Sequence, residues 1–209
     1  MNKRRLTSDE TLPIMLSFAG AIGVLPLAII RLRDGDWMIG LFDAFLVVCM
    51  AGLGLYVLRT QRVRVASVLL SIVCVIGVVT TIALKGPAQS FWAYPAVLAV
   101  FFLLSPREAS VAALTMIVGM APVLVLNAPG ITATSVLVTL LVTSAFAYAF
   151  SVLTNDQREQ LFNLASHDPL TGAGNRRAFE ERLDDIVARN QRQPLSASLL
   201  MLDLDHFKR

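Results

Sequence analysis

Two acidic residues near the carboxyl end of the sequence have the spacing of a divalent-metal site. Asp203 and Asp205 close an apolar run, Leu195–Leu204, that is typical of a buried strand. Residues two apart on a strand project to the same face, so both carboxylates face one side. Such oxygen donors suit Mg²⁺, which neutralises a triphosphate and activates an attacking hydroxyl, and Lys208 adds a point charge for a phosphate. A polar strand end that runs into a turn is an equal alternative.

A further acid lies in a much more apolar setting. Asp43 is the only ionisable residue inside a predicted membrane segment. A charge at the bilayer centre costs at least about 2.5–3.5 kcal/mol, so an intramembrane acid is a candidate for sensing or ligand binding. The alternative is a structural role, because Asp43 lies about two helical turns from the outer end of its segment, where water or snorkelling can reach it.

A turn and a helix must position the carboxyl-terminal acids. In the run Asp168-Pro-Leu-Thr171-Gly172, the aspartate can cap backbone amides and the glycine permits a sharp turn. Asn175 is then placed to cap a helix that runs to about Gln193. The apolar residues of that helix recur at the spacing of one helical face, which predicts an amphipathic helix with one buried face: Phe179, Leu183, Ile186 and Val187.

Composition divides the 209 residues into two parts. The sequence is 56% hydrophobic and 16% charged, against about 45–50% and about 25% in an ordinary soluble domain. Residues 12–153 hold 11 of the 33 charged residues, whereas residues 154–209 hold 17. This excludes a disordered or collagenous protein and a typical soluble enzyme. Two cysteines exclude a disulfide scaffold, and a net charge of +3 gives no support for a nucleic-acid partner.

The apolar part predicts a polytopic bundle in contact with membrane lipid. A membrane helix needs about 20 apolar residues. Breaks at polar clusters give six such stretches, of which the fourth is the shortest: 12–30, 37–58, 65–84, 91–104, 109–126 and 134–153. With the amino terminus inside, eight basic residues are cytoplasmic and three are outside, so we expect both termini in the cytoplasm. The predicted fold is mainly α, with residues 1–153 as an integral-membrane sensory domain.

Residues 154–167 continue the chain without a proline or glycine, which favours a helix that extends out of the last span. We interpret this segment as a cytoplasmic signalling helix. It is too short to show sustained heptads, so a homodimer through this helix is a hypothesis.

Two runs in the right order resemble the opening of a GGDEF domain, the catalytic domain of diguanylate cyclases. They are HDPLTGAGNRRAFEERL (His167–Leu183) and LLMLDLDHFK (Leu199–Lys208). The resemblance covers about 45 residues and implies that residues 168–209 begin an α/β domain of the ferredoxin-like, palm-like type. The family joins two GTP molecules into cyclic di-GMP across a dimer, with Mg²⁺, and a membrane-anchored member would sit in the inner membrane.

The resemblance also assigns roles to single residues. Asp203 and the Leu204 carbonyl match metal contacts, and Asp168 matches a turn residue whose role is architectural, with Thr171 and Asn175 in the same structural turn. Three further residues match the phosphate region: His206, Phe207 and Lys208. The guanine-binding asparagine and the G-G-[DE]-E-F hairpin are not in the 209 residues. We therefore expect a truncated catalytic domain that is inactive as it stands, because phosphoryl transfer needs its metal clamp and its nucleophile together.

Three other functions compete with a membrane-bound cyclase. A six-span receptor or binding module with a remnant cytoplasmic tail is the main alternative. A transporter or channel ranks last, because it predicts more intramembrane polar groups than one aspartate. A histidine-kinase role for His167 fails, since no ATP-binding glycine boxes follow it.

Overall fold

The computed structural model describes residues 8–166, 171–190 and 198–202. The chain divides into two compact units, residues 1–154 and 155–209. Almost every regular element in the described part is a helix: α1 (Ser8–Arg33), α2 (Trp37–Thr60), α3 (Val63–Lys85), the 3₁₀ helix η1 (Pro87–Trp92), α4 (Ala93–Leu103), α5 (Pro106–Asn127), α6 (Gly130–Ser166) and α7 (Arg176–Asn190).

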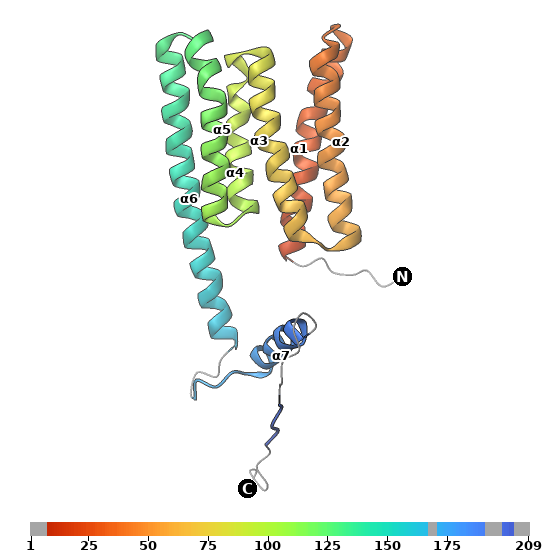
Figure 1. Cartoon of the computed structure of the whole chain (residues 1–209), viewed down its shortest axis with the longest axis vertical. Coiled ribbons are helices and arrows are strands. Elements are labelled where there is room, and N and C mark those ends of the chain that lie inside the picture. Colours follow the sequence, from red (N-terminus) through yellow and green to blue (C-terminus); the bar gives the residue numbers. More distant parts are fainter. Residues whose placement is uncertain (1–7, 167–170, 191–197, 203–209) are drawn as a thin grey trace. The chain divides into compact units, whose positions relative to one another are not determined.

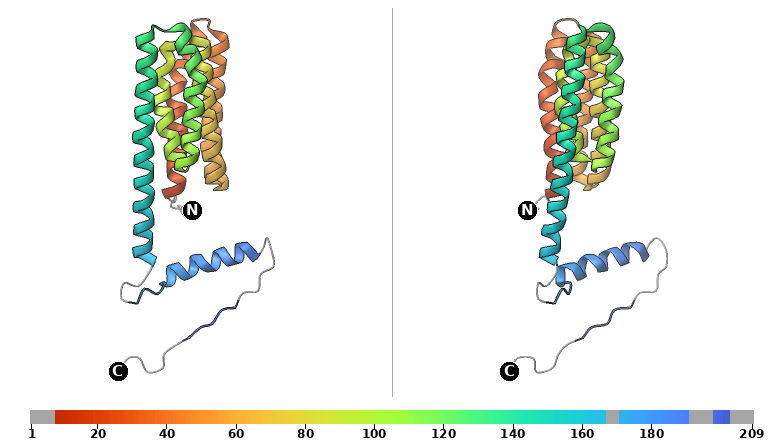
Figure 2. Two further views of the ribbon diagram at one scale, coloured as in Figure 1. Left: turned by 60° about the vertical axis from the view of Figure 1, so that its left-hand side comes forward. Right: turned by 90° about the vertical axis from the view of Figure 1, so that its left-hand side faces the viewer.

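In the first unit the helices stand side by side, and successive helices run in opposite directions (Figures 1 and 2). Five of them, α1, α2, α3, α5 and α6, are long and apolar enough to cross a membrane. The predicted fourth span is shorter, because the apolar helical segment there is Pro87–Leu103 and its first six residues form the 3₁₀ helix. The mainly helical, membrane-compatible architecture is thus confirmed. The described residues show five helices of membrane-spanning length and one shorter apolar segment, so the six spans stay a prediction.

Local sequence signals set the helix ends. Helix α5 starts at Ser105-Pro106, and the Glu108 carboxylate accepts hydrogen bonds from the Ser105 hydroxyl at 2.6 Å and from its backbone N–H at 3.2 Å. Proline suits the first position of a helix because it has no N–H to satisfy. Helix α3 stops at Gly86, whose φ of +83° is costly for any residue with a side chain.

Helix α4 lies in the middle of the larger apolar core. Fully buried side chains from α4, α5 and α6 meet there, among them Val97, Met116 and Leu140. A second cluster, around Met50 and Leu70, joins α1, α2 and α3 and also contains Leu103 at the end of α4. Many large apolar side chains elsewhere on the unit are exposed, as a lipid-facing surface requires.

Helix α4 also packs directly on α6. The hydroxyls of Tyr94 and Thr139 share a hydrogen bond, and the rings of Phe101 and Tyr148 meet edge to face with centroids 6.5 Å apart. The Ser151 hydroxyl donates to the Phe101 carbonyl at 3.4 Å. Among the described α-helices, the shortest, α4, is therefore in direct contact with the longest, α6.

The second unit differs from the expectation in two respects. Helix α7 forms with the predicted spacing, but Phe179 and Val187 are about half exposed rather than buried. The predicted strand over Leu195–Leu204 is wrong for residues 198–202, which have no regular secondary structure and exposed side chains. The physical reason is shared: a strand or an amphipathic face needs a partner to bury it, and the described residues of this unit supply none.

Candidate functional site

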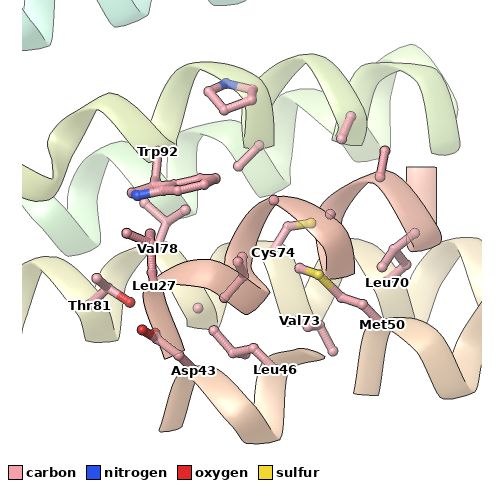
Figure 3. A pocket seen from close by; sticks show the side chains of 18 of the residues that line it. Leu27, Asp43, Leu46, Met50, Leu70, Val73, Cys74, Val78, Thr81 and Trp92 are labelled. Carbon is pink, nitrogen blue, oxygen red and sulfur yellow. The ribbon is translucent and has the colours of Figure 1, made fainter. Parts of the chain in front are cut away.

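A cavity of about 270 Å³ lies within the first unit, between α1, α2, α3 and the start of α4 (Figure 3). Its wall is apolar over most of its length. The side chains that shape it include Leu46 and Met50 from α2, Cys74 and Val78 from α3, and Trp92 before α4. The Trp92 ring lies across the cavity from Leu46.

The predicted candidate Asp43 is at one end of this cavity. The Arg31 guanidinium donates to the Asp43 carboxylate at 2.5 Å, and its other terminal nitrogen donates to the side-chain oxygen of Gln89 at 2.8 Å. The two charged side chains are 12% and 3% exposed, so the ion pair is buried. Three elements, α1, α2 and η1, are joined by this arginine.

Two other ion pairs lie at the ends of the bundle and are more exposed. Lys85 pairs with Asp36 at 2.5 Å, and Arg64 pairs with Glu108. Each pair joins helices that are far apart in the sequence. Because their side chains are a third to more than half exposed, they contribute less than a buried pair.

Sequence reasoning missed the partner of Asp43 and the polar residue Thr81. Thr81 lines the same end of the cavity and is 7% exposed. A signal for Arg31 was present, since Arg31 and Asp43 flank the short α1–α2 connection and so come to a similar depth in an antiparallel hairpin. For Thr81 the sequence held no signal, because its role depends on how α3 is rotated.

The turn and cap of the second unit are partly described. The Asn175 side-chain oxygen accepts a hydrogen bond from the Ala178 N–H at 3.2 Å, at the start of α7. The Thr171 hydroxyl accepts one from the Ala173 N–H at 3.3 Å. Asn175 therefore has the geometry of a helix N-cap.

The predicted turn residue Asp168 lies outside the described residues. So do the predicted metal and phosphate residues: Asp203, Leu204, Asp205, His206, Phe207 and Lys208. Within the described part, no group of three or more His, Cys, Asp or Glu side chains is arranged to hold a metal ion. The predicted Mg²⁺ site thus rests on the donor types in the sequence.

Comparison with known proteins places the carboxyl-terminal segment. The family model described as "Diguanylate cyclase, GGDEF domain" matches residues 165–209. Diguanylate cyclase DgcP of Pseudomonas aeruginosa is 48% identical over 63 residues, which are 30% of this chain and 9% of that protein. Diguanylate cyclase DgcS of Shewanella oneidensis is 45% identical over 53 residues, 25% of this chain and 18% of that protein. No solved structure matches the chain.

The segment is therefore similar to the GGDEF domain of diguanylate cyclases, as the sequence motifs indicated. The chain spans less than a fifth of the length of either relative. The membrane-compatible bundle that precedes residue 165 lies outside the family match.

Proposed function

We propose that this chain belongs to a membrane-bound diguanylate cyclase, in which the helical bundle senses a signal and a GGDEF domain makes cyclic di-GMP. One observation carries the proposal: a GGDEF-like segment begins at residue 165, at the end of a helix that starts among membrane-compatible helices. Helix α6 continues for 37 residues, more than the roughly 20 that cross a bilayer. An unbroken helix is suited to pass a rotation or a change in pairing to the domain attached at its carboxyl end.

We further propose six spans, with both termini in the cytoplasm of an inner-membrane protein. A 3₁₀ helix rises about 2.0 Å per residue and an α-helix 1.5 Å. Laid end to end, the six residues of η1 and the eleven of α4 extend over about 28 Å, close to the roughly 30 Å hydrocarbon core. The alternation of helix directions is consistent with the charge asymmetry of the connections.

The catalytic roles are proposals from the family resemblance. Asp203 and the Leu204 carbonyl would hold Mg²⁺, which would stabilise the developing charge on the GTP phosphates. His206, Phe207 and Lys208 would contact those phosphates. The 209 residues contain no G-G-[DE]-E-F sequence, so the activity is proposed for a polypeptide with the complete domain, working as a homodimer.

The test is cyclic di-GMP synthesis by the complete gene product in membranes supplied with GTP and Mg²⁺. Asp203→Asn is expected to reduce synthesis by at least about a hundredfold, because it removes a metal ligand. Asp184→Asn is the matched control, since Asp184 lies on the solvated face of α7. Equal activity of Asp203→Asn and the unmodified protein would contradict the assigned role.

A second candidate function is a receptor without catalysis, and the cavity favours it. Its lining residues all belong to the first unit, so ligand binding does not require the GGDEF-like segment. Absence of cyclic di-GMP synthesis by the complete gene product, together with ligand binding by the bundle, would select this alternative.

A further inference from the structure

The polar end of the cavity has hydrogen-bonding capacity that none of the described residues uses. One Asp43 oxygen, Oδ2, accepts from Arg31, whereas Oδ1 accepts no hydrogen bond from any residue that the structure describes. Thr81 is 7% exposed, and its hydroxyl likewise has no hydrogen bond within the described ranges. Figure 3 shows the oxygen ends of both side chains at the same end of the cavity.

Among the threonines of the described helices, Thr81 is the only one that is buried, and its hydroxyl has no hydrogen bond within the described residues. Four others donate to the carbonyl three or four residues earlier, as helical threonines commonly do: Thr60, Thr115, Thr139 and Thr143. A buried polar group without a partner costs about 1–3 kcal/mol, so a partner for Thr81 is favoured. Thr81 and Asp43 Oδ1 together offer one hydroxyl and one carboxylate oxygen to a single polar group.

The charge balance selects an uncharged partner. Arg31 and Asp43 already neutralise each other, so a carboxylate or an ammonium group would bring an unpaired charge into a buried site. A hydroxyl group has one donor and two acceptor positions. It can donate to Asp43 Oδ1 and accept from Thr81 at the same time.

The remainder of the cavity fits an apolar body of limited size. An apolar cavity of about 150 Å³ holds benzene, so about 270 Å³ accommodates roughly eleven non-hydrogen atoms. Thr81 lies eleven residues from Leu70 along α3, and both line the cavity, so it extends about 16 Å along the helix. The polar end lies near the last turn of α3, and the apolar end lies toward its middle.

The wall between α1 and α4 is made of small residues that leave the cavity open. Ala19 and Gly23 on α1 and Pro95 on α4 line it and are exposed. An exposed face at this level of a membrane helix faces lipid. A molecule dissolved in the bilayer can therefore enter sideways with its polar end near the interface.

We propose that the cavity binds an uncharged amphiphile of about ten carbon atoms with one hydroxyl group, taken up from the bilayer. The hydroxyl pairs with Asp43 and Thr81, and the apolar body lies against Leu46, Val78 and Trp92. The inference rests on the proposed sensing function, since it names the chemical class of the signal.

Binding is measured with the 209-residue chain in phosphatidylcholine nanodiscs. The chain has two tryptophans, so Trp37→Phe leaves Trp92, in the cavity wall, as the fluorescent reporter. Decanol, decane, decanoate and decylamine are compared at equal mole fractions in the bilayer. Decanol is expected to change the Trp92 emission saturably and to bind about five- to tenfold more tightly than the other three, as one or two hydrogen bonds predict.

Three substitutions separate the head-group contact from the cavity. Thr81→Val keeps the side-chain shape and is expected to weaken decanol about fivefold while leaving decane unchanged. Gly23→Leu is expected to abolish binding of all four probes, because a Cβ at Gly23 meets only the Trp92 ring, at 3.9 Å, and the longer side chain fills the cavity. Gly52→Leu on α2 is the matched control, since a Cβ there meets nothing within 4 Å and Gly52 is not in the cavity wall.

The outcomes distinguish the occupants. Equal binding of decane and decanol would overturn the proposal in favour of a lipid acyl chain with a water at the polar end. Tighter binding of decanoate or decylamine would overturn the uncharged head group. If decanol binds but does not change cyclic di-GMP synthesis by the complete gene product, the proposed sensing function fails and the binding inference stands. If decanol does not bind while the complete gene product still makes cyclic di-GMP, the binding inference fails and the proposed cyclase function stands.

Discussion

The buried ion pair between Arg31 and Asp43 is predicted to stabilise the bundle much more than an exposed pair with the same N···O distance would. Asp43→Asn keeps the shape of the side chain and removes its charge, which leaves a cation that is 12% exposed without a counter-ion. Removing one partner of a buried pair costs about 3–5 kcal/mol, and the remaining bond to Gln89 favours the lower figure. At about 2–4 °C per kcal/mol, a loss of about 3 kcal/mol lowers Tm by about 6–12 °C.

The chain supplies a matched control for this measurement. Asp36 pairs with Lys85 at the same 2.5 Å, but the two side chains are 51% and 32% exposed. An exposed pair contributes about 0–1 kcal/mol, so Asp36→Asn is expected to lower Tm by less than about 4 °C. Both variants are unfolded by heat in the same detergent and followed by circular dichroism. Equal losses from the two substitutions would refute the reasoning that burial gives the pair its strength.

The helix contacts lead to three further predictions. Leu140→Ala is expected to lower the free energy of unfolding by about 2–5 kcal/mol, because the Leu140 side chain is fully buried. Leu141 is 52% exposed, so Leu141→Ala is expected to change it by less than about 1 kcal/mol. Thermal unfolding in detergent compares the two variants, and equal losses of stability would place α6 outside the core. Asn175→Ala is expected to weaken the start of α7 by about 1 kcal/mol and Asn175→Asp to preserve it, which hydrogen exchange of the α7 amides measures; unchanged exchange in the alanine variant would contradict the cap. The number of spans is tested with single cysteines at Thr60 and Ser105, in a chain without its native cysteines. An impermeant maleimide is expected to label both from the same side of the membrane, because α3 and the Pro87–Leu103 segment both lie between them. Labelling from opposite sides would show five spans.

Much of the helical architecture of the first unit could be predicted from composition, because a helix long enough to cross a bilayer needs an apolar run of about 20 residues. Five of the six predicted apolar stretches fall within longer helices, whereas the stretch 91–104 covers the end of η1, the whole of α4 and the residue after it. The predicted stretch 134–153 lies within α6, Gly130–Ser166, and the predicted stretch 12–30 lies within α1, Ser8–Arg33. Backbone hydrogen bonding continues past the point where side chains become polar, so apolar boundaries underestimate helix length.

The cavity and its polar end could not be predicted in the same way. Arg31 falls just after the predicted stretch 12–30, yet it lies in the last turn of α1 and reaches Asp43 and Gln89. The second of these partners is 58 residues away in the sequence, so the contact depends on how η1 packs against α1. The predicted strand failed for a related reason: an apolar run indicates burial but not the neighbour that provides it.

Helix α4 links the cavity to the helix that leads into the GGDEF-like segment. On one side it supplies Pro95 and Ala99 to the cavity wall, and on another it holds α6 through Tyr94 and Phe101. A molecule bound between α1 and α4 would set the spacing between these two helices. Because α4 is short, a change in its position would be taken up at its contacts with α6, which include the Tyr94–Thr139 hydrogen bond, two aromatic ring pairs and the bond from Ser151 to the Phe101 carbonyl. Coupling requires an element with two arrangements that both sites bias, and α4 is the element in contact with both. Under the proposed function, the displacement that carries the signal therefore lies at the contact between α4 and α6, not at Asp43 itself.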